Sequence, residues 1–161
     1  MRLEVRLPAW LKPSARTDVA QLQAGVRPAI RTEIVGKVPD SEIRGWARQN
    51  GWYVRVDGSF VSFSPTASHA RRVIEIDRSL KAHTSELGMA LGYPPCCCRA
   101  AARVGENEID ARASKISDRR FVGLFRLINP KAYASGTALL SHVPCSPRCI
   151  PSLRMAIEAS S

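Results

Sequence analysis

The sequence predicts an α+β fold, in which a small N-terminal α/β part carries a β-hairpin and a mainly helical, cysteine-rich part follows. Two observations predict this arrangement. Two strand-like runs, residues 52–56 and 59–63, flank the turn-forming pair Asp57-Gly58. Every cysteine comes after residue 95, in a region whose apolar residues recur at helical spacing. We therefore divide the chain into an α+β part, residues 1–66, and a helical metal-binding part, residues 67–161.

The length and composition are those of a globular protein. With 161 residues, of which 45% are hydrophobic and 24% charged, the chain can bury a core without disulfides or a metal. No apolar run reaches the roughly 18 residues of a membrane span. Glu4 and Arg6 stand where a signal peptide would have its apolar core. We expect a cytoplasmic protein with no membrane partner.

Strands are predicted at three places. Alternation over residues 2–7 predicts a short first strand, residues 33–35 are expected to form another, and the hairpin supplies two more. In the hairpin, Gly58 tolerates the positive φ that a type I′ turn over Asp57-Gly58 requires. Pro65 is expected to end the second hairpin strand because proline cannot donate to the ladder.

The other predicted elements are helices. Their starts are marked by Ser, Thr, Asp or Pro, and several of their ends by Gly. They cover residues 14–24, 40–51, 68–81, 84–92, 94–105, 106–128 and 151–159.

The net charge of +10 narrows the choice of partner. A positive field attracts nucleic acid, anionic small molecules or an acidic protein, and it is also what a merely solvated basic surface produces. Nucleic-acid modules interleave aromatic with basic residues. Only 6% of this chain is aromatic and no recognition signature occurs, so a small anionic substrate or an acidic protein partner is expected before nucleic acid.

Three consecutive cysteines, Cys96, Cys97 and Cys98, follow Pro94-Pro95. Proline favours the first helical turn, so the cysteines are expected in that turn, where free N–H groups and the positive helix end stabilise thiolates. Successive helical residues point about 100° apart. Two adjacent sulfurs can therefore reach one site, while the third packs in the core.

A second group, Cys145 and Cys149, lies near the C-terminus. Ser146-Pro147 between them is typical of a helix start, but Pro151 interrupts a continuous helix, so a turn or a short 3₁₀ segment is expected. His142 lies just upstream, within reach of the same site. Arg148 is placed to neutralise a bound anion. His142 and Arg148 are the predicted catalytic residues.

Together, Cys96, Cys97, Cys145 and Cys149 predict a four-thiolate metal site. Their spacing matches none of the common zinc patterns, and adjacent cysteines on a helix are awkward ligands for a single zinc ion. An iron–sulfur cluster spreads its attachment points over several irons, which favours a 4Fe-4S cluster, with zinc as the alternative. Metal-free thiol chemistry and ordinary buried cysteines are the other interpretations.

The two cysteine segments resemble a family. Leu91-Gly-Tyr-Pro-Pro-Cys-Cys97 and His142-Val-Pro-Cys-Ser-Pro-Arg-Cys149, with Ser152, are similar to a poorly characterised bacterial and archaeal cysteine-rich domain whose pattern is Gly-Tyr-Pro-x-Cys-Cys followed by His-x-Pro-Cys-Ser-x-x-Cys. The resemblance covers roughly residues 83–155. It implies that Cys96 and Cys97 belong to the pattern, that Cys98 is extra, and that His142 is a pattern residue.

The leading functional hypothesis is an iron–sulfur enzyme, of the lyase or sulfur-transfer type, that acts on a small anionic or sulfur-containing substrate. Arg148 and Arg99 would hold the substrate. One alternative is a structural-zinc module whose basic surface binds nucleic acid or an acidic partner. The other is a metal-free thiol enzyme in which His142 activates Cys97 or Cys145.

Overall fold

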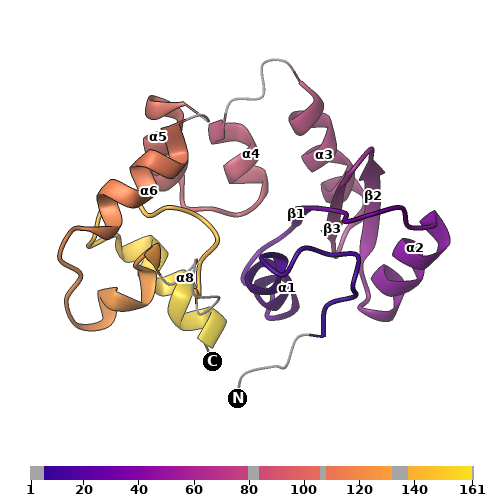
Figure 1. The fold of residues 1–161 in the computed structure, drawn as a ribbon, viewed down its shortest axis with the longest axis horizontal. Coiled ribbons are helices and arrows are strands. Elements are labelled where there is room, and N and C mark those ends of the chain that lie inside the picture. The colour runs from indigo at the N-terminus through magenta and orange to yellow at the C-terminus, as the bar shows by residue number, and fades with distance from the viewer. Residues whose placement is uncertain (1–5, 80–83, 106–107, 132–137, 161) are drawn as a thin grey trace.

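The structure is a computed structural model that describes residues 6–79, 84–105, 108–131 and 138–160. It confirms the predicted α+β class (Figure 1). The strands are β1 (Ile30–Glu33), β2 (Tyr53–Asp57) and β3 (Phe60–Ser64). The helices are α1 (Ala15–Gln23), α2 (Asp40–Gln49), α3 (Ala67–Arg78), α4 (Thr84–Ala90), α5 (Pro95–Val104), α6 (Ile109–Ser117), the 3₁₀ helix η2 (Gly123–Ile128) and α8 (Ile150–Ser160).

The three strands form one antiparallel sheet in the order β1-β3-β2, with β3 in the centre. Side chains alternate between the two faces of a strand. Val61 and Phe63 therefore share one face, where they pack with apolar residues of α1 and α2. Ser62 and Ser64 point to the opposite face, which α3 covers. Helices thus cover both faces of the sheet.

The hairpin is confirmed, but its turn differs from the prediction. Asp57 pairs with Phe60, so the two-residue loop is Gly58-Ser59. Gly58 has φ +57°, and no non-glycine residue in the described part of the chain has a positive φ. A type I′ turn needs a positive φ at both central positions, so that prediction is wrong, and the pattern is that of a type II′ turn. Asp57 stays in the strand, where Arg78 of α3 donates to both its carboxylate oxygens at 2.7 and 2.6 Å.

The predicted N-terminal strand is wrong where it can be compared. Arg6 and Leu7 form no strand, and residues 2–5 lie outside the described residues. Leu7 instead packs against the apolar cluster of the sheet. The strand predicted over residues 33–35 is displaced, because β1 ends at Glu33 and Ile34 makes only an isolated bridge with Leu11.

The long helix predicted over residues 106–128 is wrong in its middle. The helix α6 ends at Ser117, and η2 begins only at Gly123, whose φ is +54°. The break allows Phe121 and Ile128 to enter the apolar cluster that also contains Met155 of α8. Residues 106 and 107 lie outside the described residues, as do residues 80 and 81 of the helix predicted over 68–81, which ends at Arg78.

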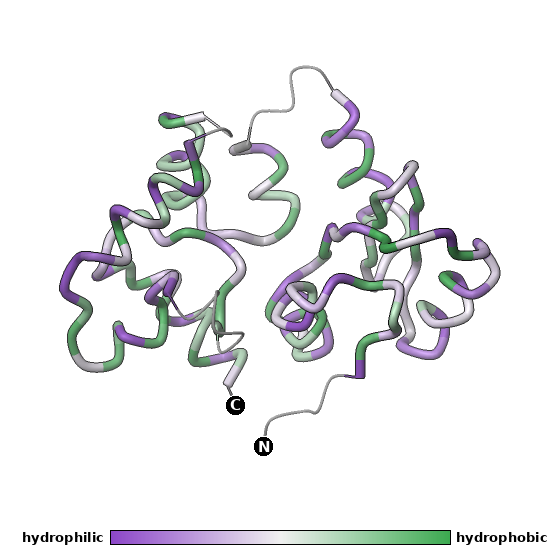
Figure 2. Tube along the Cα trace, in the orientation of Figure 1, coloured by the Kyte–Doolittle hydropathy of each residue, from purple (hydrophilic) through white to green (hydrophobic). Residues whose placement is uncertain are grey.

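Apolar residues gather on the inner faces of the helices. Figure 2 shows hydrophilic and hydrophobic residues alternating along most helices, as amphipathic helices require. One buried cluster lies on the sheet, and a second lies among α5, η2 and α8. In Figure 1 these two regions lie on opposite sides of the view, with α4 between them. The division of the chain after residue 66 stays a prediction, and α3, the first element beyond it, packs on β2 and β3.

A buried arginine joins the two regions. Arg27, only 2% exposed, forms an ion pair with Asp18 of α1. Its guanidinium also donates to the Ser141 hydroxyl and to the Leu91 carbonyl, both at 2.9 Å, and lies 4.5 Å from the centre of the Tyr93 ring. The chain before the sheet is therefore tied to the two segments that precede the cysteine groups.

Candidate metal centre

The structure brings four sulfurs together from two distant segments. The sulfurs of Cys96, Cys97, Cys145 and Cys149 all lie within 4.8 Å of one another, a grouping that is close enough to bind a metal ion. The Cys96–Cys97 distance is 3.9 Å, the Cys96–Cys149 distance 3.8 Å and the Cys97–Cys149 distance 3.6 Å. Cys97 and Cys149 are buried, whereas Cys96 and Cys145 are half-buried.

The first pair of cysteines is positioned by the start of α5. Pro94 has extended backbone angles, and its carbonyl accepts hydrogen bonds from the Cys97 and Cys98 N–H groups at 2.8 and 3.0 Å. Pro95 is the first residue of α5, a position where proline loses no hydrogen bond. Cys96 and Cys97 consequently lie in the first turn, beside the positive end of the helix dipole.

The second pair lies in the turn before α8, as the sequence predicts for this segment. Cys149 donates its N–H to Ser146 at 3.2 Å and accepts from the Leu153 N–H at 3.0 Å, so it immediately precedes α8. The N–H of Cys145 points to the Cys97 sulfur at 3.3 Å. The starts of α5 and α8 therefore both face the sulfurs, and both favour negative charge there.

Without a metal, the thiols compete for protons. The hydrogen bond from Cys97 lowers the pKa of Cys149 to about 4, while that same bond and burial raise the pKa of Cys97. Burial, together with the hydrogen bond and negative charge of Cys149, raises the pKa of Cys145 to about 11. Of these three cysteines, Cys149 is therefore the one favoured as a thiolate. A metal ion would have to displace the remaining protons, because thiolates are the binding form.

A hydroxyl and an imidazole lie directly behind the sulfurs. The Ser152 Oγ is 3.3 Å from the Cys97 sulfur and 2.9 Å from His142 Nε2. Burial, and secondarily the positive charge of Arg27, lowers the pKa of His142 to about 3. His142 is therefore neutral near pH 7. The sequence predicts no role for Ser152, and its position shortly after Cys149 is the only sign that it could belong to the site. In the structure the Ser152 hydroxyl lies between His142 and Cys97.

The remaining predicted residues lie elsewhere. Cys98 is buried outside the sulfur group, and its Sγ faces the Tyr93 carbonyl at 3.6 Å. It packs so closely on α4 that a Cβ added at Gly88 would lie 2.8 Å from its sulfur. Arg99 and Arg148, the predicted substrate-binding residues, are exposed, and neither lines the cavity next to Cys145.

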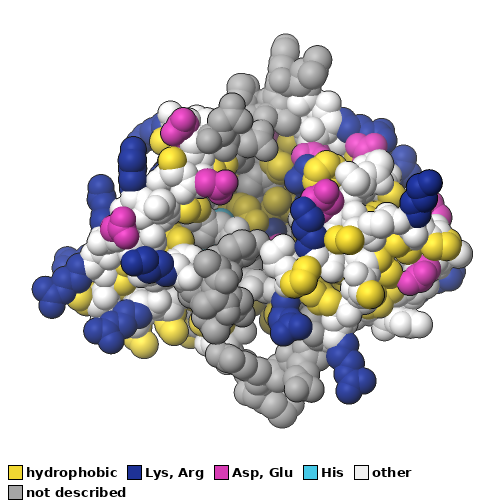
Figure 3. All heavy atoms as spheres, in the orientation of Figure 1, with side chains coloured by type: hydrophobic (Ala, Val, Ile, Leu, Met, Phe, Trp, Pro, Cys, Tyr) yellow, Lys and Arg dark blue, Asp and Glu magenta, His cyan; other side chains and the backbone are white. Residues whose placement is uncertain are grey.

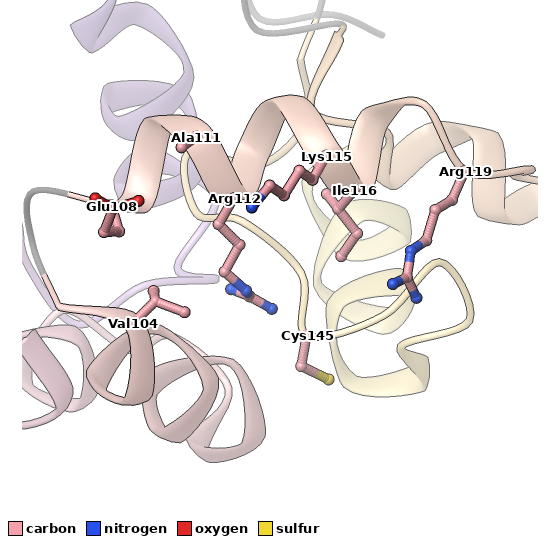
Figure 4. Close-up of a pocket in the computed structure, with 8 residues that line it drawn as sticks. All are labelled: Val104, Glu108, Ala111, Arg112, Lys115, Ile116, Arg119 and Cys145. Atoms are coloured by element: carbon pink, nitrogen blue, oxygen red, sulfur yellow. The ribbon is translucent and has the colours of Figure 1, made fainter.

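That cavity has a volume of about 370 Å³ and lies between α5, α6 and the loop of Cys145 (Figure 4). Arg112, Lys115 and Arg119 extend towards it from α6 and the turn that follows. These three cations are not among the residues predicted from the sequence. Their spacing of three and four residues, which places them on one helical face, was the available signal.

No family model, curated protein or solved structure matches the chain. The family resemblance therefore rests on the residues of its two cysteine motifs. In the described part of the chain, no helix combines the length and apolar character needed to traverse a bilayer.

Proposed function

We propose that the protein is a zinc-binding protein in which Cys96, Cys97, Cys145 and Cys149 hold a single ion. The observation that carries this proposal is that the sulfurs of Cys96, Cys97 and Cys149 lie 3.6, 3.8 and 3.9 Å apart, with the Cys145 sulfur within 4.8 Å of each of them. Four sulfurs at about 2.3 Å from one tetrahedral zinc ion lie about 3.8 Å apart. Cysteines adjacent in sequence thus have the separation that one ion requires, which removes the objection raised by the motif spacing.

The same distances argue against the iron–sulfur hypothesis. A cluster inserts several irons and sulfides between its ligands, so thiolates bound to different irons lie farther apart than the ligands of one ion. An iron–sulfur enzyme with lyase or sulfur-transfer activity is consequently the alternative that the experiment below must reject. A metal-free thiol enzyme is also disfavoured, since His142 bonds to Ser152 instead of a cysteine.

The site has the features of a structural zinc centre. Four cysteine ligands complete the tetrahedron and leave no open position for a substrate. The ligands connect the start of α5 to the turn before α8, segments about fifty residues apart in the chain. Zinc would join these two segments through four metal–sulfur bonds. Ser152, held by His142, orients the Cys97 sulfur, as groups behind metal ligands commonly do.

On one face of the molecule, the distribution of charge favours a discrete anionic partner over a nucleic-acid backbone. On the face seen in Figure 3, Lys and Arg side chains are scattered among Asp and Glu instead of forming one continuous track. A protein that follows a nucleic-acid backbone needs such a track.

Metal analysis of protein purified without oxygen, from medium containing both iron and zinc, tests the proposal. We expect one zinc per chain, no labile sulfide and a colourless solution. Cys97→Ser should lose the zinc, whereas the matched Cys98→Ser variant should retain it because Cys98 lies outside the sulfur group. Cobalt substitution of the wild-type protein provides a readout independent of the variants, since tetrahedral thiolate coordination gives intense visible bands.

Two results would reject the proposal. Several irons with equivalent sulfide per chain would establish a cluster. Absence of any metal, with all four grouped thiols open to alkylation in the folded protein, would establish a metal-free site.

A further inference from the structure

We propose that the cavity beside Cys145 binds a small organic phosphate. The proposal deepens the zinc function, because Cys145 belongs both to the sulfur group and to the wall of the cavity. It rests on the charge, the shape and the unused hydrogen-bonding capacity of that wall.

The charge of the cavity matches a dianion. Three cations, Arg112, Lys115 and Arg119, line it together with one carboxylate, that of Glu108. None of the three cations forms an ion pair with a residue that the structure describes. Like charges three or four residues apart on a helix destabilise it. An anion between them would relieve this repulsion.

The guanidinium of Arg112 has one nitrogen, Nη1, whose donor capacity no described residue uses. Its Nη2 donates to the Pro144 carbonyl at 3.1 Å, which fixes the guanidinium against the loop of Cys145. Its Nη1 is buried, yet it has no hydrogen-bond partner in the described ranges of the chain. A buried donor without a partner is unfavourable, and a small rotation of the guanidinium into the cavity would let a phosphate oxygen satisfy it with a charge-assisted bond. Figure 4 shows this guanidinium directed towards Cys145 at the base of the cavity.

Part of the lining suits an organic group. Val104 of α5 and Ala111 and Ile116 of α6 give the cavity apolar surface, and the volume of about 370 Å³ lies within the range of small-molecule sites, about 300–1,000 Å³. A phosphate on the cations would place its organic substituent against these apolar side chains.

Neutralisation of the metal site is a second role for the same cations, and the experiment must distinguish it from phosphate binding. A zinc ion with four thiolates carries two negative charges, and nearby cations would offset them. Neutralisation of the metal site requires only that the charges be near Cys145. It does not require a cavity, an apolar wall or a selective affinity for an added anion.

Calorimetric titration of the zinc-loaded protein with phenyl phosphate, inorganic phosphate and phenol tests the inference. We expect one phenyl phosphate per chain, bound about tenfold more tightly than inorganic phosphate, and no binding of phenol. The double variant Lys115→Gln/Arg119→Gln should weaken phenyl phosphate binding about tenfold or more. The matched double variant Arg103→Gln/Arg120→Gln removes the same charge outside the cavity and should leave the affinity within about twofold.

A second variant tests the location without changing the charge. Ala111 is exposed at the rim, so Ala111→Phe should fill the cavity and abolish phenyl phosphate binding while the zinc content stays at the wild-type level.

Three outcomes would overturn the inference: no saturable binding of phenyl phosphate, equal weakening by the two double variants, or unchanged binding in Ala111→Phe. Loss of zinc from Lys115→Gln/Arg119→Gln, with no phosphate binding by the wild type, would assign the cations to the metal site. Zinc is measured in every sample. Phosphate binding by a protein that contains no zinc would support the inference while rejecting the proposed function.

Discussion

His142 is a half-buried histidine behind the sulfurs, where its Nε2 lies 2.9 Å from the Ser152 hydroxyl. Its pKa in the folded protein is lowered to about 3, first by burial and then by Arg27. An unfolded histidine has a pKa of about 6.5. Between these values the unfolded chain binds a proton that the folded protein does not bind. Stability therefore falls as the pH drops from about 6.5 towards 3, and it is unaffected by this group above that window.

We predict that His142→Asn makes the free energy of unfolding less sensitive to acid. The difference in slope from the wild type should approach 1.4 kcal/mol per pH unit within the window, and it should vanish above about pH 7. Urea unfolding at a series of pH values, with zinc saturating, measures both slopes. Parallel curves for the two proteins would show that His142 titrates normally in the folded state.

Gly92 is a second residue with a sharply defined role, because it lets the start of the cysteine motif approach the chain before β1. Its φ is +82°, and a Cβ at this position would lie 2.4 Å from the Pro28 Cδ. We predict that Gly92→Ala destabilises the protein by about 2 kcal/mol or more, through both backbone strain and the clash. Chemical unfolding provides the measurement.

Gly45 provides the matched control. It lies inside α2 with ordinary φ, and a Cβ there would meet nothing within 4 Å. Gly45→Ala should therefore stabilise the protein by about 0.5–1 kcal/mol. Equal effects of the two substitutions would contradict the close approach at Gly92.

At the scale of single elements, helix starts differ in whether a side chain accepts a hydrogen bond from a free N–H of the first turn. The Thr66 hydroxyl accepts a hydrogen bond from the His69 N–H at the start of α3. Ser14, the residue before α1, makes no such bond. We expect Thr66→Ala to cost about 1 kcal/mol and Ser14→Ala to cost much less. Thermal unfolding of both variants tests this, and a larger loss from Ser14→Ala would reverse the assignment.

The elements also show what a sequence can predict and what it cannot. The helices α5 and α8 and the hairpin were predictable because proline, glycine and residue alternation act locally. The break between α6 and η2 was not, because it depends on burying Phe121 against residues distant in sequence. The turn type failed for the same reason, since Arg78 of α3 holds Asp57 in its strand.

The candidate site, too, has a part set by local sequence and a part set by packing between distant segments. Each cysteine pair belongs to a short motif, and helix geometry alone indicated that two of the three consecutive sulfurs would share a site while the third would not. For the cations of the cavity, the sequence offers only their helical spacing, because the packing of α6 against the loop of Cys145 is what gives them a common target.

At the scale of the whole molecule, the tryptophans and the sulfurs report on different regions. Trp10, Trp46 and Trp52 all belong to the apolar cluster of the sheet, whereas Cys97 and Cys149 belong to the other cluster. We predict that a strong zinc chelator causes a large loss of helical circular dichroism with little change in tryptophan emission. Restoring zinc should recover the signal.

This result would also test the predicted division of the chain, because it requires the sheet to hold its structure while the cysteine-rich part loses its own. A simultaneous change in both signals would mean that links such as those of Arg27 make the molecule unfold as one unit.

The short distances between the sulfurs also determine how the protein responds to oxidants. In the folded protein the Cys97 and Cys149 sulfurs lie 3.6 Å apart, and the lowered pKa of Cys149 favours its reactive thiolate form. An oxidant that accepts two electrons joins this pair as a disulfide, after which neither sulfur is a metal ligand. The zinc ion proposed above would block that reaction by binding both sulfurs. Zinc lost in air would consequently not be regained until a reductant reopened the bond.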